Sequence, residues 1–239
     1  MKMPSPQIGF DRFIDLEWVT AALRIRAGLA AVQELDGILE HSHAGLAARK
    51  KTRTVLNRLW LEPREELVDF ANRGIELFRA DPKSIVPALS WGMAIATYPF
   101  FGRVAEIVGR LTALQGDCAS AEVHRRMSEI YGEREGTRRM TNMVLQSQAS
   151  WGGASRKEGG RRIVRKQTIN LQGAPISAWL AEACLRYTGR TIAVASIATS
   201  PVLYPFDLGG ATAYLLSKSR WIEVRTDGAG SQIFGLASL

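Results

Sequence analysis

Residues 137–171 read TRRMTNMVLQSQASWGGASRKEGGRRIVRKQTINL, and this stretch decides the fold that we expect for the chain. Its first half carries apolar residues at helical spacing, so residues 138–151 predict a helix that Thr137 can cap. Its second half contains four glycines and the turn sequence Glu158-Gly159-Gly160, followed by β-prone residues around Ile163. The stretch therefore predicts a helix and then a β-hairpin.

Two more predicted helices come before this stretch. Pro99 opens the first, which ends at Gly116, and the second covers residues 121–131 and ends at Gly132. Three helices followed by a β-hairpin is the order of a winged helix-turn-helix unit, in which the third helix enters the major groove and the hairpin lies over neighbouring phosphates. We therefore expect residues 101–171 to form a winged-helix-like domain with a basic wing.

The basic and amide side chains of this unit are the candidate nucleic-acid-binding residues. In the third helix we expect groove contacts from Arg138, Arg139 and Asn142, with Gln146 and Gln148 on accessible turns, because Arg, Asn and Gln can bond to base edges. The hairpin concentrates positive charge within eleven residues, opposed by Glu158 alone. Its candidate phosphate ligands are Arg156, Lys157, Arg161, Arg162, Arg165 and Lys166. A solvated basic loop is the alternative reading of the same run.

The remaining sequence predicts a helical domain over residues 1–100 and a second winged-helix-like domain over residues 172–239. In the latter, residues 209–219 predict a short helix, and residues 221–236 alternate apolar and polar side chains around Asp227-Gly228, which predicts a hairpin. This domain has fewer basic residues than the first. Packing against the first unit and binding a protein partner are therefore equal alternatives to DNA contact. The expected fold class is mainly α with small β-hairpins, an α+β protein.

Charge and hydropathy limit the partners that we expect. The net charge is +8 and the apolar fraction is 46%, so the chain can bury a core and attract polyanions. The uncharged segment 84–102 is interrupted by Pro87 and Pro99, which favours a buried core helix followed by a second helix over a membrane span. Two cysteines, Cys118 and Cys184, fit a reduced cytoplasmic compartment.

Catalytic and metal-binding patterns do not emerge from the sequence. His41 and His43 form a His-x-His pair without further ligands at a familiar spacing, and we find neither a phosphate-binding glycine loop nor a serine elbow. We therefore expect no enzyme activity, no metal and no cofactor, although a nuclease with an unfamiliar arrangement stays open. The basic run Arg49, Lys50, Lys51 and Arg53 either extends a DNA-binding face or is an exposed helix turn.

The order of features over residues 44–151 resembles the BrxA proteins of BREX phage-defence systems. The residues that carry the resemblance are RKKTRTVLNRLW (49–60), PREELVDFANRG (63–74) and ALSWGMAIATYPFFGRVAEIVGRL (88–111). The resemblance implies a small helical and winged-helix DNA-binding protein of antiviral defence, and it carries over no individual residue. We expect a double-stranded DNA-binding protein of phage defence or gene regulation. The alternatives are a protein-binding assembly component, a peripheral membrane protein that uses residues 84–112, and an RNA-binding protein.

Overall fold

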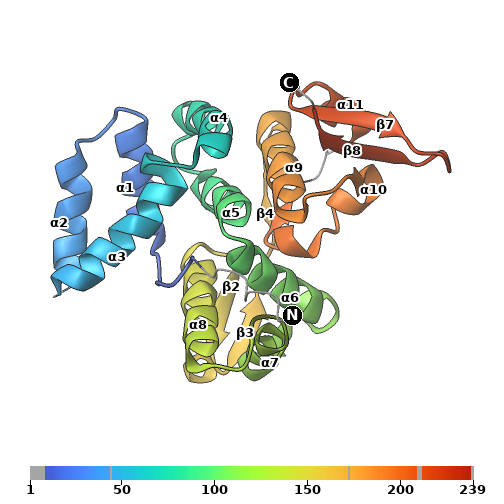
Figure 1. Cartoon of the computed structure of the whole chain (residues 1–239). Helices are drawn as coiled ribbons and strands as arrows, with labels where there is room; N and C mark the ends of the chain where they lie inside the picture. Colours follow the sequence, from blue (N-terminus) through green and yellow to red (C-terminus); the bar gives the residue numbers. More distant parts are fainter. Residues whose placement is uncertain (1–8, 44, 172, 209–211, 238–239) are drawn as a thin grey trace, which may run out of the picture.

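The N-terminal part of the chain is helical. The structure, a computed structural model, describes residues 9–43, 45–171, 173–208 and 212–237 (Figure 1). The helices of the N-terminal region are α1 (Leu16–Arg26), α2 (Val32–Ser42), α3 (Leu46–Leu56), the π-helical turn η1 (Asn57–Leu61), the 3₁₀ turn η2 (Glu65–Leu67) and α4 (Val68–Ala80). Each packs an apolar stripe inward, because its apolar residues recur every three or four positions.

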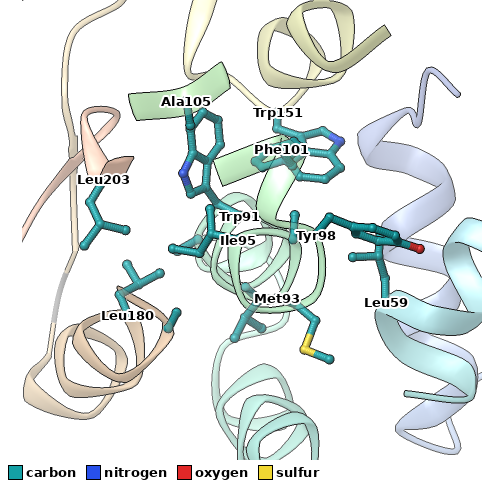
Figure 2. Packing of buried hydrophobic residues seen from close by; sticks show 14 of the residues in the cluster. Leu59, Trp91, Met93, Ile95, Tyr98, Phe101, Ala105, Trp151, Leu180 and Leu203 are labelled. Carbon is teal, nitrogen blue, oxygen red and sulfur yellow. The ribbon is translucent and has the colours of Figure 1, made fainter. Parts of the chain in front are cut away.

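Helix α5 (Val86–Thr97) lies at the centre of the molecule and contacts helices from both halves of the chain. Figure 2 shows its Trp91 and Ile95 between Leu180 and Leu203 on one side and Phe101 and Trp151 on another. This helix is the uncharged segment that the sequence predicts as a core helix, and that prediction is confirmed by its burial. In the part of the chain that is described, no helix combines the length and apolar character needed to cross a bilayer.

A three-stranded antiparallel sheet follows α5 in the lower part of Figure 1. Its strands lie in the order β1-β3-β2, so the first strand pairs with the last. The elements of this region are α6 (Pro99–Gln115), β1 (Asp117–Ala119), α7 (Ser120–Tyr131), α8 (Glu135–Ser150), β2 (Ala154–Lys157), the turn η3 (Glu158–Gly160) and β3 (Arg162–Arg165). The predicted hairpin around the Glu158-Gly159-Gly160 turn is confirmed.

The C-terminal region repeats this order of elements around a second antiparallel sheet, β5-β8-β7. Its elements are β4 (Ile169–Asn170), α9 (Ala174–Thr188), β5 (Ile192–Ala193), α10 (Val194–Ile197), η4 (Pro201–Leu203), β6 (Phe206–Asp207), α11 (Ala213–Ser217), β7 (Ile222–Thr226) and β8 (Gln232–Leu236). The hairpin around Asp227 is confirmed. The helix predicted over 209–219 is present as α11 over residues 213–217, and residues 209–211 lie outside the described residues.

The two sheet regions interlock rather than follow one another as separate units. Strand β4 lies inside the predicted first unit, residues 101–171. It nevertheless pairs in parallel with β6 of the C-terminal region, with Ile169 opposite Phe206. Helix α6 also lies against η4 so closely that a Cβ on Gly109 would fall 2.0 Å from the carbonyl oxygen of Pro201. One cluster of buried apolar side chains extends through all three regions. The mainly helical α+β class is thus confirmed, while the domain boundaries near residues 100 and 171 stay a prediction.

The structure corrects two sequence expectations for α8. The helix begins at Glu135 after Arg134, and Thr137 lies buried inside it instead of capping it. Gln148 is also buried, where its side-chain oxygen accepts a hydrogen bond from the Tyr204 hydroxyl at 3.3 Å. The sequence alone predicts Gln148 on an accessible turn because a polar residue normally faces solvent, whereas here the C-terminal region covers it.

Candidate nucleic-acid interface

The exposed surface of α8 is confined to its N-terminal half. Arg138 and Arg139 are exposed and Asn142 is half-buried, and the three lie on one side of the helix. The opposite side packs into the core through Thr137, Thr141, Val144 and Leu145. The residues that sequence reasoning assigns to groove contacts therefore share the solvent-facing side of α8.

The C-terminal half of α8 is covered by the chain segment that leads into α1. The backbone N–H of Ile14 donates to Ser147 Oγ at 2.8 Å, and Trp151 Nε1 donates to the carbonyl of Ile14 at 3.0 Å. The backbone N–H of Leu16 donates to Ser150 Oγ at 3.0 Å. These bonds join residues more than 130 positions apart in the sequence. The fully exposed residues of α8 therefore lie in its first two turns, whereas Gln146 and Ala149 beyond them are half-buried.

Strand pairing divides the basic residues of the hairpin between the two faces of the sheet. Side chains alternate along a strand, and residues directly opposite each other share a face. Arg156 is opposite Ile163, whose side chain is buried, so Arg156 lies on the face of the sheet that turns towards α8. Lys157 is opposite Arg162 on the other face. The six basic residues of the predicted wing therefore do not form one surface.

Arg156 connects the hairpin to α8. Its Nη2 donates a hydrogen bond of 2.7 Å to Asn142 Oδ1, and partial burial lowers the pKa of its guanidinium from the ordinary value. A Cβ on Gly160 would fall 2.4 Å from the same Nη2, and Gly160 has φ +89°. Glycine at this position thus gives the turn its backbone conformation and leaves room for the Arg156 side chain.

A groove of about 410 Å³ opens between the N-terminal half of α8 and the tip of the hairpin. Four arginines line it against one carboxylate, that of Glu135. The lining residues are His124, Glu135, Arg138, Arg139, Asn142, Arg156, Gly159, Gly160 and Arg161. Five of the nine residues predicted from the sequence therefore come together here. Guanidinium groups offer several donors in a fixed plane, which suits phosphate oxygens and base edges.

The other four predicted residues lie outside the groove. Arg162 Nη2 contacts both carboxylate oxygens of Asp117 at 2.6 Å, and Arg165 Nη2 donates to the carbonyl of Tyr204 at 2.7 Å. Lys157 is exposed on the far face of the sheet, and Lys166 is exposed beyond the end of β3. Arg162 and Arg165 thus serve contacts within the fold, because each has a polar partner that holds its guanidinium.

His124 is the groove residue that sequence reasoning does not single out. It comes from α7, and burial is the main cause that lowers the pKa of its imidazole, with the charges of Arg138 and Arg156 adding to the effect. Its Nδ1 is buried without a hydrogen-bond partner among the described residues. Burial and the two arginines therefore favour the neutral form of this imidazole. No sequence signal marks this residue, because only the packing of α7 on α8 brings it to the arginines.

Four of the five basic residues described in the second sheet region contact a neighbouring side chain, and the fifth, Arg190, is exposed. Arg225 forms an ion pair with Glu223, Lys218 Nζ lies 4.3 Å from the centre of the Tyr214 ring, and Arg220 lies 4.8 Å from that of Trp221. These contacts spread the positive charge over several small features. The second region also borders a groove of about 610 Å³, in which two carboxylates, those of Glu66 and Glu223, offset the arginines Arg64, Arg186, Arg190 and Arg225.

Potential metal ligands are dispersed. Within the described ranges, no group of three or more His, Cys, Asp or Glu side chains is arranged to hold a metal ion. His41 Nδ1 lies 2.8 Å from the carbonyl of Gly37, and His43 Nε2 lies 3.2 Å from Thr52 Oγ1, so the two histidines of the His-x-His pair have separate surroundings.

Comparison with known proteins identified no relative of this chain. No family model, no curated protein and no solved structure matches the chain significantly. The geometry of the groove therefore carries the functional argument.

Proposed function

We propose that this chain binds double-stranded DNA, with residues 101–171 acting as a winged helix-turn-helix unit and α8 as its recognition helix. The observation that carries the proposal is the groove in which Arg138, Arg139, Asn142, Arg156 and Arg161 meet. It presents guanidinium and amide groups from a helix and from a hairpin turn to one ligand. Phosphates and base edges are the ligands that match these donors.

The order of elements supports the winged-helix assignment. Helix, strand, two helices and a hairpin follow one another from α6 to β3, and the first strand pairs with the last. In such units the N-terminal residues of the recognition helix contact base edges. That expectation fits α8, in which the first two turns are open and the later ones are covered.

A second winged-helix-like unit is proposed for residues 172–239 on the same grounds. The order from α9 to β8 and the sheet order β5-β8-β7 repeat those of the first unit. Its α11 is short, and its cations contact Glu223, Tyr214 and Trp221. We therefore assign DNA contact to the first unit and a packing role to the second.

Duplex DNA is favoured over RNA by the shape of the surface. A helix flanked by a hairpin fits the wide major groove of B-form DNA, whereas the major groove of A-form RNA is too deep and narrow for side chains to read. The peripheral-membrane alternative is less favoured, because the apolar side chains of α5 and most of those of α6 lie in the core. Assembly with a protein partner stays a prediction.

A place in phage defence is proposed on the resemblance to BrxA proteins alone, and a cytoplasmic location on the use of two unpaired cysteines. We expect defence genes beside the gene for this chain. We also expect defence components to copurify with the tagged protein. Neighbouring genes of unrelated metabolism, with no such copurification, would remove this part of the proposal and leave DNA binding untouched.

Binding measured at two salt concentrations tests the DNA-binding proposal. Fluorescence anisotropy with a 20-base-pair duplex, its single strands and a matched RNA duplex would be recorded at about 50 mM and about 200 mM salt. We expect the DNA duplex to bind most tightly and to lose affinity steeply with salt, because each neutralised phosphate releases counterions. Affinity for the duplex that is absent, or that does not change with salt, would contradict the proposal.

A further inference from the structure

A second hollow lies beside α8, on the flank away from the hairpin. It has a volume of about 350 Å³ and joins the N-terminal region to α8. Its lining residues are Gly9, Asp11, Lys51, Thr54, Val55, Arg58, Tyr98 and Met140. Met140 is the contribution of α8, and α3 with the turn after it contributes Lys51, Thr54 and Arg58.

Helical spacing places the three polar residues of α3 and η1 on one side. Lys51, Thr54 and Arg58 are separated by three and four positions, so they follow one another along the helix surface. All three are exposed. The Thr54 hydroxyl donates to the carbonyl of Lys50 at 3.0 Å, so the two cations, Lys51 and Arg58, are the donors that can reach a phosphate oxygen.

The neighbouring arginines of the basic run have other partners. Arg49 pairs with Glu40 and also donates to the carbonyl of His43, and Arg53 pairs with Asp36. Lys51 and Arg58 form no ion pair with any described residue. The carboxylate that shares their hollow is Asp11. The charges of Lys51 and Arg58 are therefore available to an anionic ligand in the hollow between α3 and α8.

The two hollows lie on opposite flanks of the exposed face of α8. Each residue advances an α-helix by about 100°, so Arg138 and Met140 are separated by about 200° around the axis, with Arg139 between them. Arg138 and Arg139 line the groove beside the hairpin, and Met140 lines the hollow beside α3. In the view of Figure 1, α3 accordingly lies on one side of α8 and the hairpin strands on the other.

We infer that α3 and η1 supply a second set of DNA phosphate contacts, through Lys51 and Arg58, on the flank of α8 opposite the hairpin. A duplex whose major groove receives the N-terminal half of α8 exposes one sugar-phosphate strand on each side of that helix. The hairpin arginines face one strand, and Lys51 and Arg58 face the other. The inference rests on the proposed function and specifies which further region of this chain binds the duplex.

Charge reversal on α3 tests the inference in the full-length protein. Lys51→Glu with Arg58→Glu would be compared with a control, Lys83→Glu with Arg190→Glu, which makes the same change in net charge at exposed residues outside both hollows. We expect the α3 variant to bind a 20-base-pair duplex at least about tenfold more weakly than the control. We also expect its plot of log affinity against log salt to lose about two units of slope, one for each phosphate contact.

A cross-linking measurement gives a readout that does not depend on these charges. Both native cysteines are buried, so a thiol introduced by Thr54→Cys is the accessible one. A duplex with thiol-reactive groups on its phosphates should cross-link to this variant, and a Ser84→Cys variant, whose thiol would be exposed in the turn before α5, should not. If the Lys51→Glu, Arg58→Glu protein fails to fold by circular dichroism, the cross-linking result decides.

The outcomes separate the inference from the proposed function. Wild-type protein that does not bind duplex DNA would remove both. Wild-type binding with an α3 variant that matches its control, or with no excess cross-linking at Thr54→Cys, would overturn the role of α3 and leave the groove beside the hairpin as the DNA site.

Discussion

Arg156 of β2 donates a hydrogen bond of 2.7 Å to the side-chain oxygen of Asn142 in α8. This bond joins the hairpin to the helix at the middle of the groove. The bond uses one of the two lone pairs of the Asn142 amide oxygen and aims that oxygen at Arg156, whereas recognition of an adenine edge needs both the oxygen and the nitrogen of the amide aimed at the base. Asn142 therefore positions Arg156 in the free protein.

Replacement of Asn142 should weaken DNA binding without a change in sequence preference. Asn142→Ala, Arg156→Ala and the double variant form a thermodynamic cycle, and we expect a coupling of about 1 kcal/mol in binding free energy, typical of one hydrogen bond. Anisotropy with several unrelated duplexes would measure it. Additive effects, or a loss confined to one duplex, would show that Asn142 reads bases instead.

Charge reversal inside the groove should cost more than the same change elsewhere on the hairpin. Arg138→Glu with Arg161→Glu changes two groove residues, and Lys157→Glu with Lys166→Glu changes two exposed residues outside the groove by the same charge. We expect the groove pair to bind at least about tenfold more weakly than the outer pair at 50 mM salt, because close phosphate contacts depend on position as well as charge. Equal losses would indicate a diffuse electrostatic attraction.

DNA binding should strengthen as the pH falls. The pKa of His124 lies below its ordinary value in the free protein, and a phosphate in the groove would offset the burial and the charges of Arg138 and Arg156 that lower it. The pKa then rises on binding, so the complex takes up a proton. The added affinity is present at low pH and is lost as the pH rises through the pKa of the complex. Titrations between about pH 5.5 and about pH 8, at constant ionic strength, measure this effect.

The His124→Gln variant is the control for this pH effect. It keeps a polar side chain of similar reach and does not titrate, so its affinity should depend less on pH than that of the wild type. An unchanged pH dependence in the variant would assign the effect to other groups.

Alanine at Gly160 should weaken DNA binding, and alanine at Gly159 should not. Both glycines have positive φ, so each substitution is expected to cost about 1–2 kcal/mol of folding stability. A Cβ at Gly160 would collide with Arg156, whereas a Cβ at Gly159 meets no atom within 4 Å. The comparison of DNA affinities between the two variants therefore isolates the displacement of Arg156. Similar affinities would mean that Arg156 does not contact DNA.

Neutralising Glu182 should destabilise the whole fold. Its carboxylate, 1% exposed, accepts hydrogen bonds from Arg73 at 2.5 and 2.8 Å and from Arg186. Glu182→Gln therefore leaves two mostly buried guanidiniums without their counter-charge. We expect a loss of about 3 kcal/mol in the free energy of unfolding, measured by urea denaturation. Glu223→Gln removes the exposed partner of Arg225 and should change stability little.

Local sequence signals predicted the elements whose causes are local. The Glu158-Gly159-Gly160 turn, the hairpin around Asp227 and the Pro-initiated α6 all appear where short-range turn and capping chemistry indicates them. The central position of α5 followed from its uncharged sequence, because a helix that is apolar all round must be buried.

Features that depend on distant contacts could not be read from the sequence. Gln148 is covered by Tyr204, and the β4–β6 pair has two residues on each strand, too few for any periodic pattern. Eight of the nine predicted binding residues were chosen by charge, and charge does not reveal that Arg162 pairs with Asp117 or that Arg165 donates to the carbonyl of Tyr204. The structure thus brings five of the nine predicted residues together beside α8, and the DNA contacts of all nine stay a prediction.

The strap formed by Ile14 and Leu16 over the end of α8 has a consequence for experimental design. A fragment starting near residue 100 would expose Ser147 and Trp151, whose polar atoms contact that strap in the intact chain. Such a fragment would contain α8 without the backbone of Ile14 and Leu16 that contacts the end of this helix. Dissection by truncation would therefore report misfolding as loss of function, and point substitutions in the complete protein are the way to separate the two.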